Sequence, residues 1–145
     1  YEYCNIVWAI HHTNALNQLF ITQKKAIRII TNSPWNCHTE PLFKKLNILT
    51  LYLLNDLQVG CYMFRATHSL LPFDLCNMFT HNFEIHDHNT RHKNDLHFTL
   101  NRLNSLKYSI RIHGPTLWNK LSTDLKNLSA YHIFRNRYKY ILITT

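Results

Sequence analysis

Hydrophobic residues recur at three- and four-residue spacing along most of the chain, which is the pattern of amphipathic helices. The first such segment covers residues 13–32 and ends at the Asn32–Pro34 sequence, where the residue before proline disfavours helix. Its apolar stripe consists of Leu16, Leu19, Phe20, Gln23, Ala26, Ile27 and Ile30. Ile21 and Ile29 lie outside this stripe. Their positions indicate that the helix has a second neighbour.

Three further helices are predicted in the first half of the chain. A short helix follows Thr39, a longer one runs from Thr50 to about Ser69, and another short one covers residues 73–79. Gly60 lies inside the longer helix, where glycine costs about 1 kcal/mol relative to alanine. We therefore expect another helix to pack closely against Gly60.

The pattern changes in the second half of the chain. Residues 80–94 lose the helical period and gather His, Asn and Asp, which is typical of a loop. Apolar and polar residues alternate over 106–112, which predicts a short strand near 106–113. Gly114 and Pro115 are then expected to turn the chain into a helix, and Ser129 to cap a final helix.

Length and glycine content point to one helical domain. A chain of 145 residues predicts a single domain, and its only glycines are Gly60 and Gly114. This scarcity excludes glycine-rich phosphate loops and dinucleotide fingerprints. With 46% hydrophobic and 17% charged residues, the chain is too apolar for a disordered polymer and too interrupted for a membrane span. The predicted fold is mainly α, a helical bundle over residues 1–145 with a short β segment near 106–113.

The charge balance favours an anionic partner. Sixteen Lys and Arg against eight Asp and Glu give a net charge of +8 and a pI near 9.5. The candidate nucleic-acid-binding residues are Lys24, Lys25, Arg28, Lys44, Lys45, Arg91, Lys93, Arg135 and Lys139. Within the first helix, Lys24, Lys25 and Arg28 share a quarter-turn and have no acidic residue three or four positions away. The alternative is that each basic cluster is simply a solvated face.

Cysteines and histidines do not form a recognisable metal motif. Cys4, Cys37, Cys61 and Cys76 contain no C-x-x-C pair, and we expect reduced, mostly buried thiols in an intracellular protein. The histidines that crowd one loop region are His81, His86, His88, His92 and His97. They could assemble a zinc site, but no cysteine pair anchors one, so solvated or nucleic-acid-facing histidines are favoured and no metal site is predicted.

Three tryptophans have apolar neighbours. Trp8, Trp35 and Trp118 could stack on nucleic-acid bases, but their neighbours favour roles in the core. No secretory signal is visible, and the chain begins at Tyr1 rather than Met, so we expect it to be part of a longer protein.

Several short motifs stand in a fixed order along the chain. They are QKKAIRII at 23–30, PLF at 41–43, LNIL at 46–49, LP at 71–72, IHDHNTR at 85–91 and HGPTLWNKL at 113–121. The ordered set covers nearly the whole chain and resembles the C-terminal region, the thumb and post-palm part, of reverse transcriptases from non-LTR (LINE-type, jockey-like) retrotransposons. Two positions depart from the family: His88 replaces a usual aromatic residue, and Ser122 stands where a proline is usual.

The resemblance implies a nucleic-acid-binding region without catalysis of its own. In the family, adjacent aspartates of the palm hold the metals, whereas this chain has no two adjacent acidic residues. The expected parent is an RNA-directed DNA polymerase that uses Mg²⁺, while this chain alone would have no cofactor and no polymerase activity. The expected partners are RNA or an RNA–DNA template-primer duplex and the palm and fingers of the parent, in the nucleus and cytoplasm, with no membrane. The alternatives are a stand-alone helical module that binds a protein through Ile21 and Ile29, or an inert relic of a degraded element.

Overall fold

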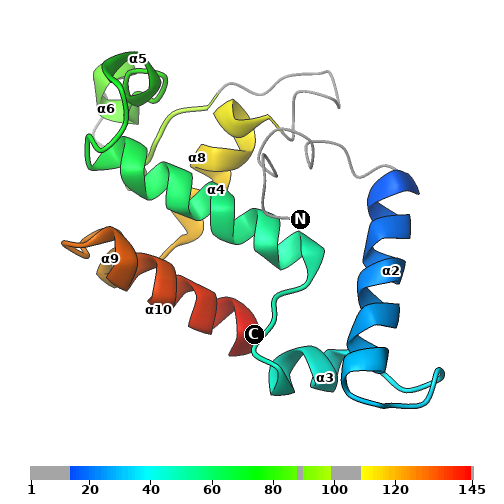
Figure 1. The fold of residues 1–145 in the computed structure, drawn as a ribbon. Coiled ribbons are helices and arrows are strands. Elements are labelled where there is room, and N and C mark those ends of the chain that lie inside the picture. Colours follow the sequence, from blue (N-terminus) through cyan, green and yellow to red (C-terminus); the bar gives the residue numbers. More distant parts are fainter. Residues whose placement is uncertain (1–13, 88–89, 99–108, 145) are drawn as a thin grey trace.

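The computed structural model describes residues 14–87, 90–98 and 109–144. These residues form eight helices (Figure 1): α2 (Asn14–Ile30), α3 (Glu40–Lys45), α4 (Leu51–Thr67), α5 (Phe73–Cys76), α6 (Asn82–Ile85), α8 (Ile110–Lys120), α9 (Thr123–Lys126) and α10 (Tyr131–Thr144). Within the same ranges, β pairing is limited to one isolated bridge between His81 and Leu96. The fold is mainly helical, as the hydrophobic periodicity predicts.

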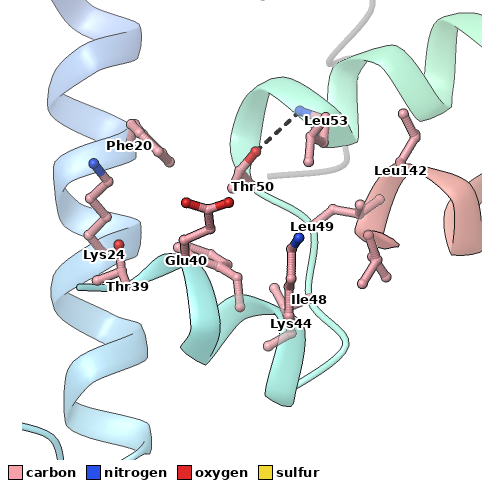
Figure 2. Close-up of a pocket in the computed structure, with 12 residues that line it drawn as sticks. Phe20, Lys24, Thr39, Glu40, Lys44, Ile48, Leu49, Thr50, Leu53 and Leu142 are labelled. Carbon is pink, nitrogen blue, oxygen red and sulfur yellow. Dashed lines mark hydrogen bonds between the residues drawn. The ribbon is translucent and has the colours of Figure 1, made fainter. Parts of the chain in front are cut away.

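Helix α4 is the centre of the fold. It packs against α8 on one side and α10 on another, and α9 packs beside α10 (Figure 1). Helices α2 and α3 lie at the N-terminal end of α4, whereas α5 and α6 lie at its C-terminal end. The α4 boundaries agree closely with the sequence prediction, because the Thr50 hydroxyl accepts from the Leu53 N–H at 3.4 Å and caps the helix (Figure 2).

A polar side chain joins α2 to the start of α4. Gln23 Nε2 donates to the Leu49 carbonyl at 3.0 Å, and Gln23 Oε1 accepts from the Leu51 N–H at 2.9 Å. Leu51 is the first residue of α4, so its N–H has no acceptor within that helix. Gln23, the polar member of the predicted apolar stripe, therefore accepts a hydrogen bond from a backbone N–H of the neighbouring helix.

The buried side of α2 is narrower than its sequence stripe predicts. Leu16 and Ile27 are buried, whereas Ala26 and Ile30 are exposed. Because the main neighbours of α2 among the described elements are α3 and the beginning of α4, one edge of the stripe is left uncovered there. Ile29, which the sequence places outside the stripe, is 80% exposed.

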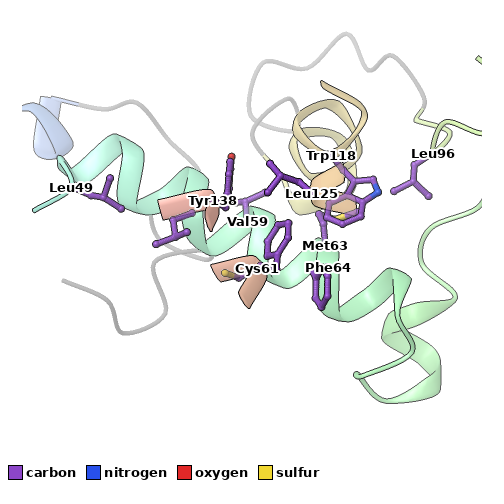
Figure 3. Close-up of a cluster of buried hydrophobic side chains, with 11 residues drawn as sticks. Leu49, Val59, Cys61, Met63, Phe64, Leu96, Trp118, Leu125 and Tyr138 are labelled. Atoms are coloured by element: carbon purple, nitrogen blue, oxygen red, sulfur yellow. The ribbon is translucent and has the colours of Figure 1, made fainter. Parts of the chain in front are cut away.

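The main core is a cluster of buried hydrophobic side chains, mostly from α4, α8 and α10, that includes four aromatic rings (Figure 3). Phe64 stacks on Phe134 with ring centroids 4.6 Å apart, and Trp118 contacts both rings. Phe64 and Phe134 are fully buried, and Trp118 is 5% exposed. Trp118 is therefore a core residue, as its apolar neighbours in the sequence suggest.

Two glycines allow the helices to approach α4 closely. A Cβ on Gly60 would overlap Tyr138 Cε1 of α10, which confirms the predicted close packing at this position. A Cβ on Gly114 of α8 would lie 2.6 Å from Met63 Sδ of α4. Each glycine thus marks a contact between two helices rather than a turn.

The predicted strand near 106–113 is wrong where the structure describes it. Residues from Ile110 onward belong to α8, and residues 106–108 lie outside the described ranges. Gly114 and Pro115 lie inside α8 and do not form the predicted turn. The physical reason is that Ile112, Pro115 and Trp118 recur at three-residue spacing and are all buried, so a helix buries more apolar surface than the alternating pattern could.

Several short elements also differ from the prediction. The loop predicted over 80–94 contains α6, which begins with a capping box between His81 and Glu84. Helix α5 is shorter than predicted, α9 has no counterpart in the sequence prediction, and α10 begins at Tyr131, two residues after the predicted cap at Ser129. Side-chain hydrogen bonds hold the start of α6, whereas α5 and α9 have no side-chain cap, and α9 packs beside α10.

Two expectations about burial are only partly met. Cys37, Cys61 and Cys76 are free thiols, but only Cys61 is buried. Trp35 is 86% exposed, so the core role predicted for it is wrong; it lies in the segment that follows the end of α2. Cys4 and Trp8 lie outside the described ranges.

Candidate nucleic-acid interface

The lysine and arginine side chains in the described ranges have no acidic partner. The two ion pairs found there both involve histidine: His92 with Asp95 at 2.7 Å and His113 with Asp56 at 3.3 Å. In this part of the chain, no lysine or arginine nitrogen lies within 4.0 Å of a carboxylate oxygen. No carboxylate in this part of the chain therefore neutralises the positive charge of these side chains.

The three cations of α2 have different surroundings. Lys25 is exposed, and Lys24 Nζ lies 4.2 Å from the centre of the Phe20 ring, a cation–π contact. Arg28 Nε and Nη2 both donate to the Cys37 carbonyl, at 3.1 and 3.0 Å. Arg28 thus fixes the segment that follows α2, whereas both lysines keep their ammonium groups available.

A cavity of about 280 Å³ lies between α2 and α3 (Figure 2). Lys24 of α2 and Lys44 of α3 both line it, together with Glu40 and apolar residues that include Phe43 and Leu49. Lys45 is exposed on α3. The fold therefore brings Lys24 and Lys44, which are distant in sequence, to one cavity.

The remaining predicted cations lie in other parts of the fold. Arg91 and Lys93 are exposed in the segment after α6, where the Phe83 N–H donates to the Lys93 carbonyl at 3.0 Å. On α10, Arg135 is exposed and Lys139 is partly buried. The predicted basic residues thus do not gather in one patch, because α3 and α6 lie at opposite ends of α4 (Figure 1).

A second cavity, of about 270 Å³, lies between α4 and α10, and both Arg65 and Arg135 line it. Arg65 Cζ lies 6.0 Å from the centre of the Tyr131 ring. Sequence reasoning missed Arg65, because it is an isolated cation within α4 and no neighbouring basic residue marks it. Only the packing of α10 on α4 gives it a cationic partner.

The same cavity contains a buried thiol. Cys61 is 6% exposed, and its sulfur shares a hydrogen bond with the Tyr131 hydroxyl. Burial raises the pKa of the Cys61 thiol, while the hydrogen bond and the charges of Arg135 and Arg65 oppose that rise. Burial likewise raises the pKa of the Tyr131 hydroxyl. At neutral pH both groups are uncharged.

The histidines near α6 hold the loop through hydrogen bonds. His81 Nδ1 lies 2.9 Å from the Asn94 carbonyl oxygen, and His97 Nδ1 lies 3.1 Å from Asn82 Oδ1. Over residues 14–87, 90–98 and 109–144, no group of three or more potential ligands could hold a metal ion. His88 lies outside these ranges.

Comparisons with known proteins give no further identification. No protein-family model, curated protein or solved structure matches the chain. Among the helices that the structure describes, none is long and apolar enough to cross a membrane. The functional assignment therefore rests on the residues and their geometry.

Proposed function

We propose that this chain is the thumb and post-palm region of a non-LTR retrotransposon reverse transcriptase. In this proposal it binds RNA or an RNA–DNA duplex through the phosphates and does no chemistry itself. The observation that carries the binding to phosphates is that a chain with a net charge of +8 has no lysine or arginine paired with a carboxylate within its described ranges. The order of its short motifs supports the same assignment.

The arrangement of the lysines suits phosphate recognition. Lysine ammonium groups contact phosphate oxygens as point charges and need no base-specific geometry. Lys24, Lys25 and Lys44 place three such groups along α2 and the facing part of α3, and none of them has a carboxylate within 4.0 Å in the described part of the chain. Binding of this kind is largely independent of sequence and weakens steeply with salt, because bound counterions are released.

The catalytic metals belong to the palm of the proposed parent. Its palm and fingers would supply the adjacent aspartates and bind Mg²⁺, and they would also be the first protein partner of this chain. The resemblance is the support for this part of the proposal.

A salt-dependent binding measurement tests the proposal. Fluorescence anisotropy would follow the binding of a labelled, primed RNA–DNA duplex at several salt concentrations. The test variant is Lys24→Gln/Lys25→Gln/Lys44→Gln. The matched control, Arg111→Gln/Lys120→Gln/Arg137→Gln, removes the same charge from exposed positions elsewhere. We expect the test variant to lower the slope of log K against log salt by about 0.7–0.9 for each phosphate that it no longer binds.

The control separates a specific interface from total charge. Equal effects in the two variants would mean that α2 and α3 are not the interface. A wild-type chain that binds neither RNA nor the duplex at low salt would overturn the proposed function.

A second candidate function is a helical module that binds a protein. Three large apolar side chains at the end of α2 and just after it favour this reading: Ile29, Ile30 and Trp35 are 80%, 65% and 86% exposed. Exposed apolar groups of this size are typical of surfaces that a partner covers. This function would replace the first if the wild-type chain binds no nucleic acid.

A further inference from the structure

The cavity between α4 and α10 has the composition of an anion site. We propose that Arg65 and Arg135 bind one phosphate group there, and that bound nucleic acid supplies this phosphate. The identity of the phosphate source rests on the proposed function, whereas the site itself rests on its own geometry.

Antiparallel packing of the two helices creates the site. Phe64 stacks on Phe134, and Gly60 lies against Tyr138, so positions that ascend along α4 face positions that descend along α10. Arg65 and Arg135 each follow one of the stacked phenylalanines in the sequence. This register places Arg65 beside Tyr131, and both arginines line the same cavity. The two guanidinium groups therefore come from two helices held together by the rigid aromatic core.

The charge of the cavity is unbalanced. No Asp or Glu lines it, and neither Arg65 nor Arg135 has a carboxylate within 4.0 Å in the described part of the chain. Two like charges beside one cavity repel each other, and a shared anion turns this repulsion into attraction. Each guanidinium presents a planar set of N–H donors that matches the oxygens of a phosphate.

The other polar groups of the cavity are neutral at physiological pH. Burial keeps the Cys61 thiol protonated, and the Tyr131 hydroxyl is protonated as well. They do not oppose an entering anion, and the Tyr131 hydroxyl is a hydrogen-bonding group at the cavity wall. The cavity therefore attracts negative charge and contains none.

Size and an aromatic neighbour favour a phosphate that is part of a strand. The cavity volume of about 270 Å³ is roughly nine times the share of one water in the liquid, so it can hold a phosphate with part of its sugar. Tyr131, beside Arg65, is 37% exposed, so part of its ring is accessible to an adjoining base. A lone inorganic ion would use neither feature.

A binding experiment with a matched control tests the two arginines. The test variant is Arg65→Gln/Arg135→Gln, and the control is Arg111→Gln/Arg137→Gln. The control removes the same residue type and charge from exposed positions outside this cavity. With a labelled single-stranded RNA, we expect the test variant to lower the salt slope by up to about 0.9 if one phosphate no longer binds, and the control to retain the wild-type affinity. Far-UV circular dichroism would verify that all variants are folded.

Alkylation of Cys61 provides a second readout, and its arm with pyrophosphate does not depend on nucleic-acid affinity. A phosphate in the cavity would cover the Cys61 sulfur and slow its reaction with N-ethylmaleimide. Cys37, which lies after α2 and does not line this cavity, is the internal reference in the same molecule. The probes are pyrophosphate and the RNA, each compared with chloride at equal ionic strength, and mass spectrometry of peptides gives both rates.

The outcomes distinguish this inference from the proposed function. Slower alkylation of Cys61 but not Cys37 with both probes, abolished in Arg65→Gln/Arg135→Gln, supports the site with nucleic acid as its source. Protection by pyrophosphate alone supports the phosphate site and assigns it to a small phosphate ester. No protection by either probe overturns the inference and leaves the proposed function standing. RNA binding unchanged by Arg65→Gln/Arg135→Gln overturns nucleic acid as the source of the phosphate and also leaves the proposed function standing. A wild-type chain that binds no RNA, yet shows protection by pyrophosphate, removes the proposed function and leaves the site.

Discussion

Replacing Gly60 by alanine tests the contact between α4 and α10. The added Cβ would overlap Tyr138 Cε1 and lie 3.0 Å from Tyr138 Cδ1. Tyr138 cannot move aside easily, because it is 4% exposed and its ring lies 5.6 Å from that of Phe134. The substitution therefore forces the aromatic core or the two helices to shift.

Two opposing effects set the change in the free energy of unfolding. Alanine is better than glycine within a helix by about 1 kcal/mol. Overpacking a well-filled core costs about 1–3 kcal/mol. Because the overlap involves a buried ring, we expect the upper part of that range and a net loss of about 1–2 kcal/mol.

Two substitutions of Tyr138 test whether its ring is the cause of the destabilisation by Gly60→Ala. Tyr138→Phe keeps the ring carbons that meet the new Cβ, so Gly60→Ala should remain destabilising there. Tyr138→Leu removes the ring, so the helix preference of alanine should dominate, and Gly60→Ala should stabilise by up to about 1 kcal/mol. Urea denaturation followed by circular dichroism gives each free energy of unfolding. A stabilising Gly60→Ala in the wild-type background would refute the reasoning about this contact.

Two other variants test the core and its buried thiol. Trp118→Ala should lower the free energy of unfolding by about 3–5 kcal/mol, since Trp118 is 5% exposed among Phe64 and Phe134; an unchanged urea midpoint would contradict its core role. Burial raises the pKa of Cys61 above its ordinary value of 9.0, so its contribution to stability is full below pH 9 and is lost as pH rises through the folded-state pKa. The melting temperature of the wild type should therefore fall more steeply above pH 9 than that of Cys61→Ala, and parallel curves would show that this thiol does not contribute.

The long helices were predictable because short-range interactions define them. The Thr50 cap and the apolar period after it involve residues at most four positions apart, and α4 spans Leu51–Thr67 against the predicted end near Ser69. Gly60 was also informative, because an unfavourable residue inside a strong helix requires a compensating contact. Its partner, Tyr138, could not be named from the sequence.

The start of α8 shows where local pattern reasoning fails. Over only a few residues, apolar side chains at Ile110 and Ile112 satisfy a strand period, and Gly114 with Pro115 is typical of a turn. The structure forms a helix instead, because Met63 of α4 packs where Gly114 has no side chain, and Pro115 is buried. A contact between residues far apart in the chain overrides the local preference.

For the basic residues, too, the sequence determined some properties and the fold determined others. The composition determined the excess of positive charge. The order of residues showed that no acidic residue lies near the cations of α2 in the sequence. Tertiary structure decided what surrounds each of them: Arg28 donates to the Cys37 carbonyl, Lys24 shares a cavity with Lys44, and Arg65 shares another with Arg135. The sequence determines charge and helical period because these are properties of single residues and near neighbours. The pairing of distant side chains depends on how the helices pack, and only the folded chain specifies that.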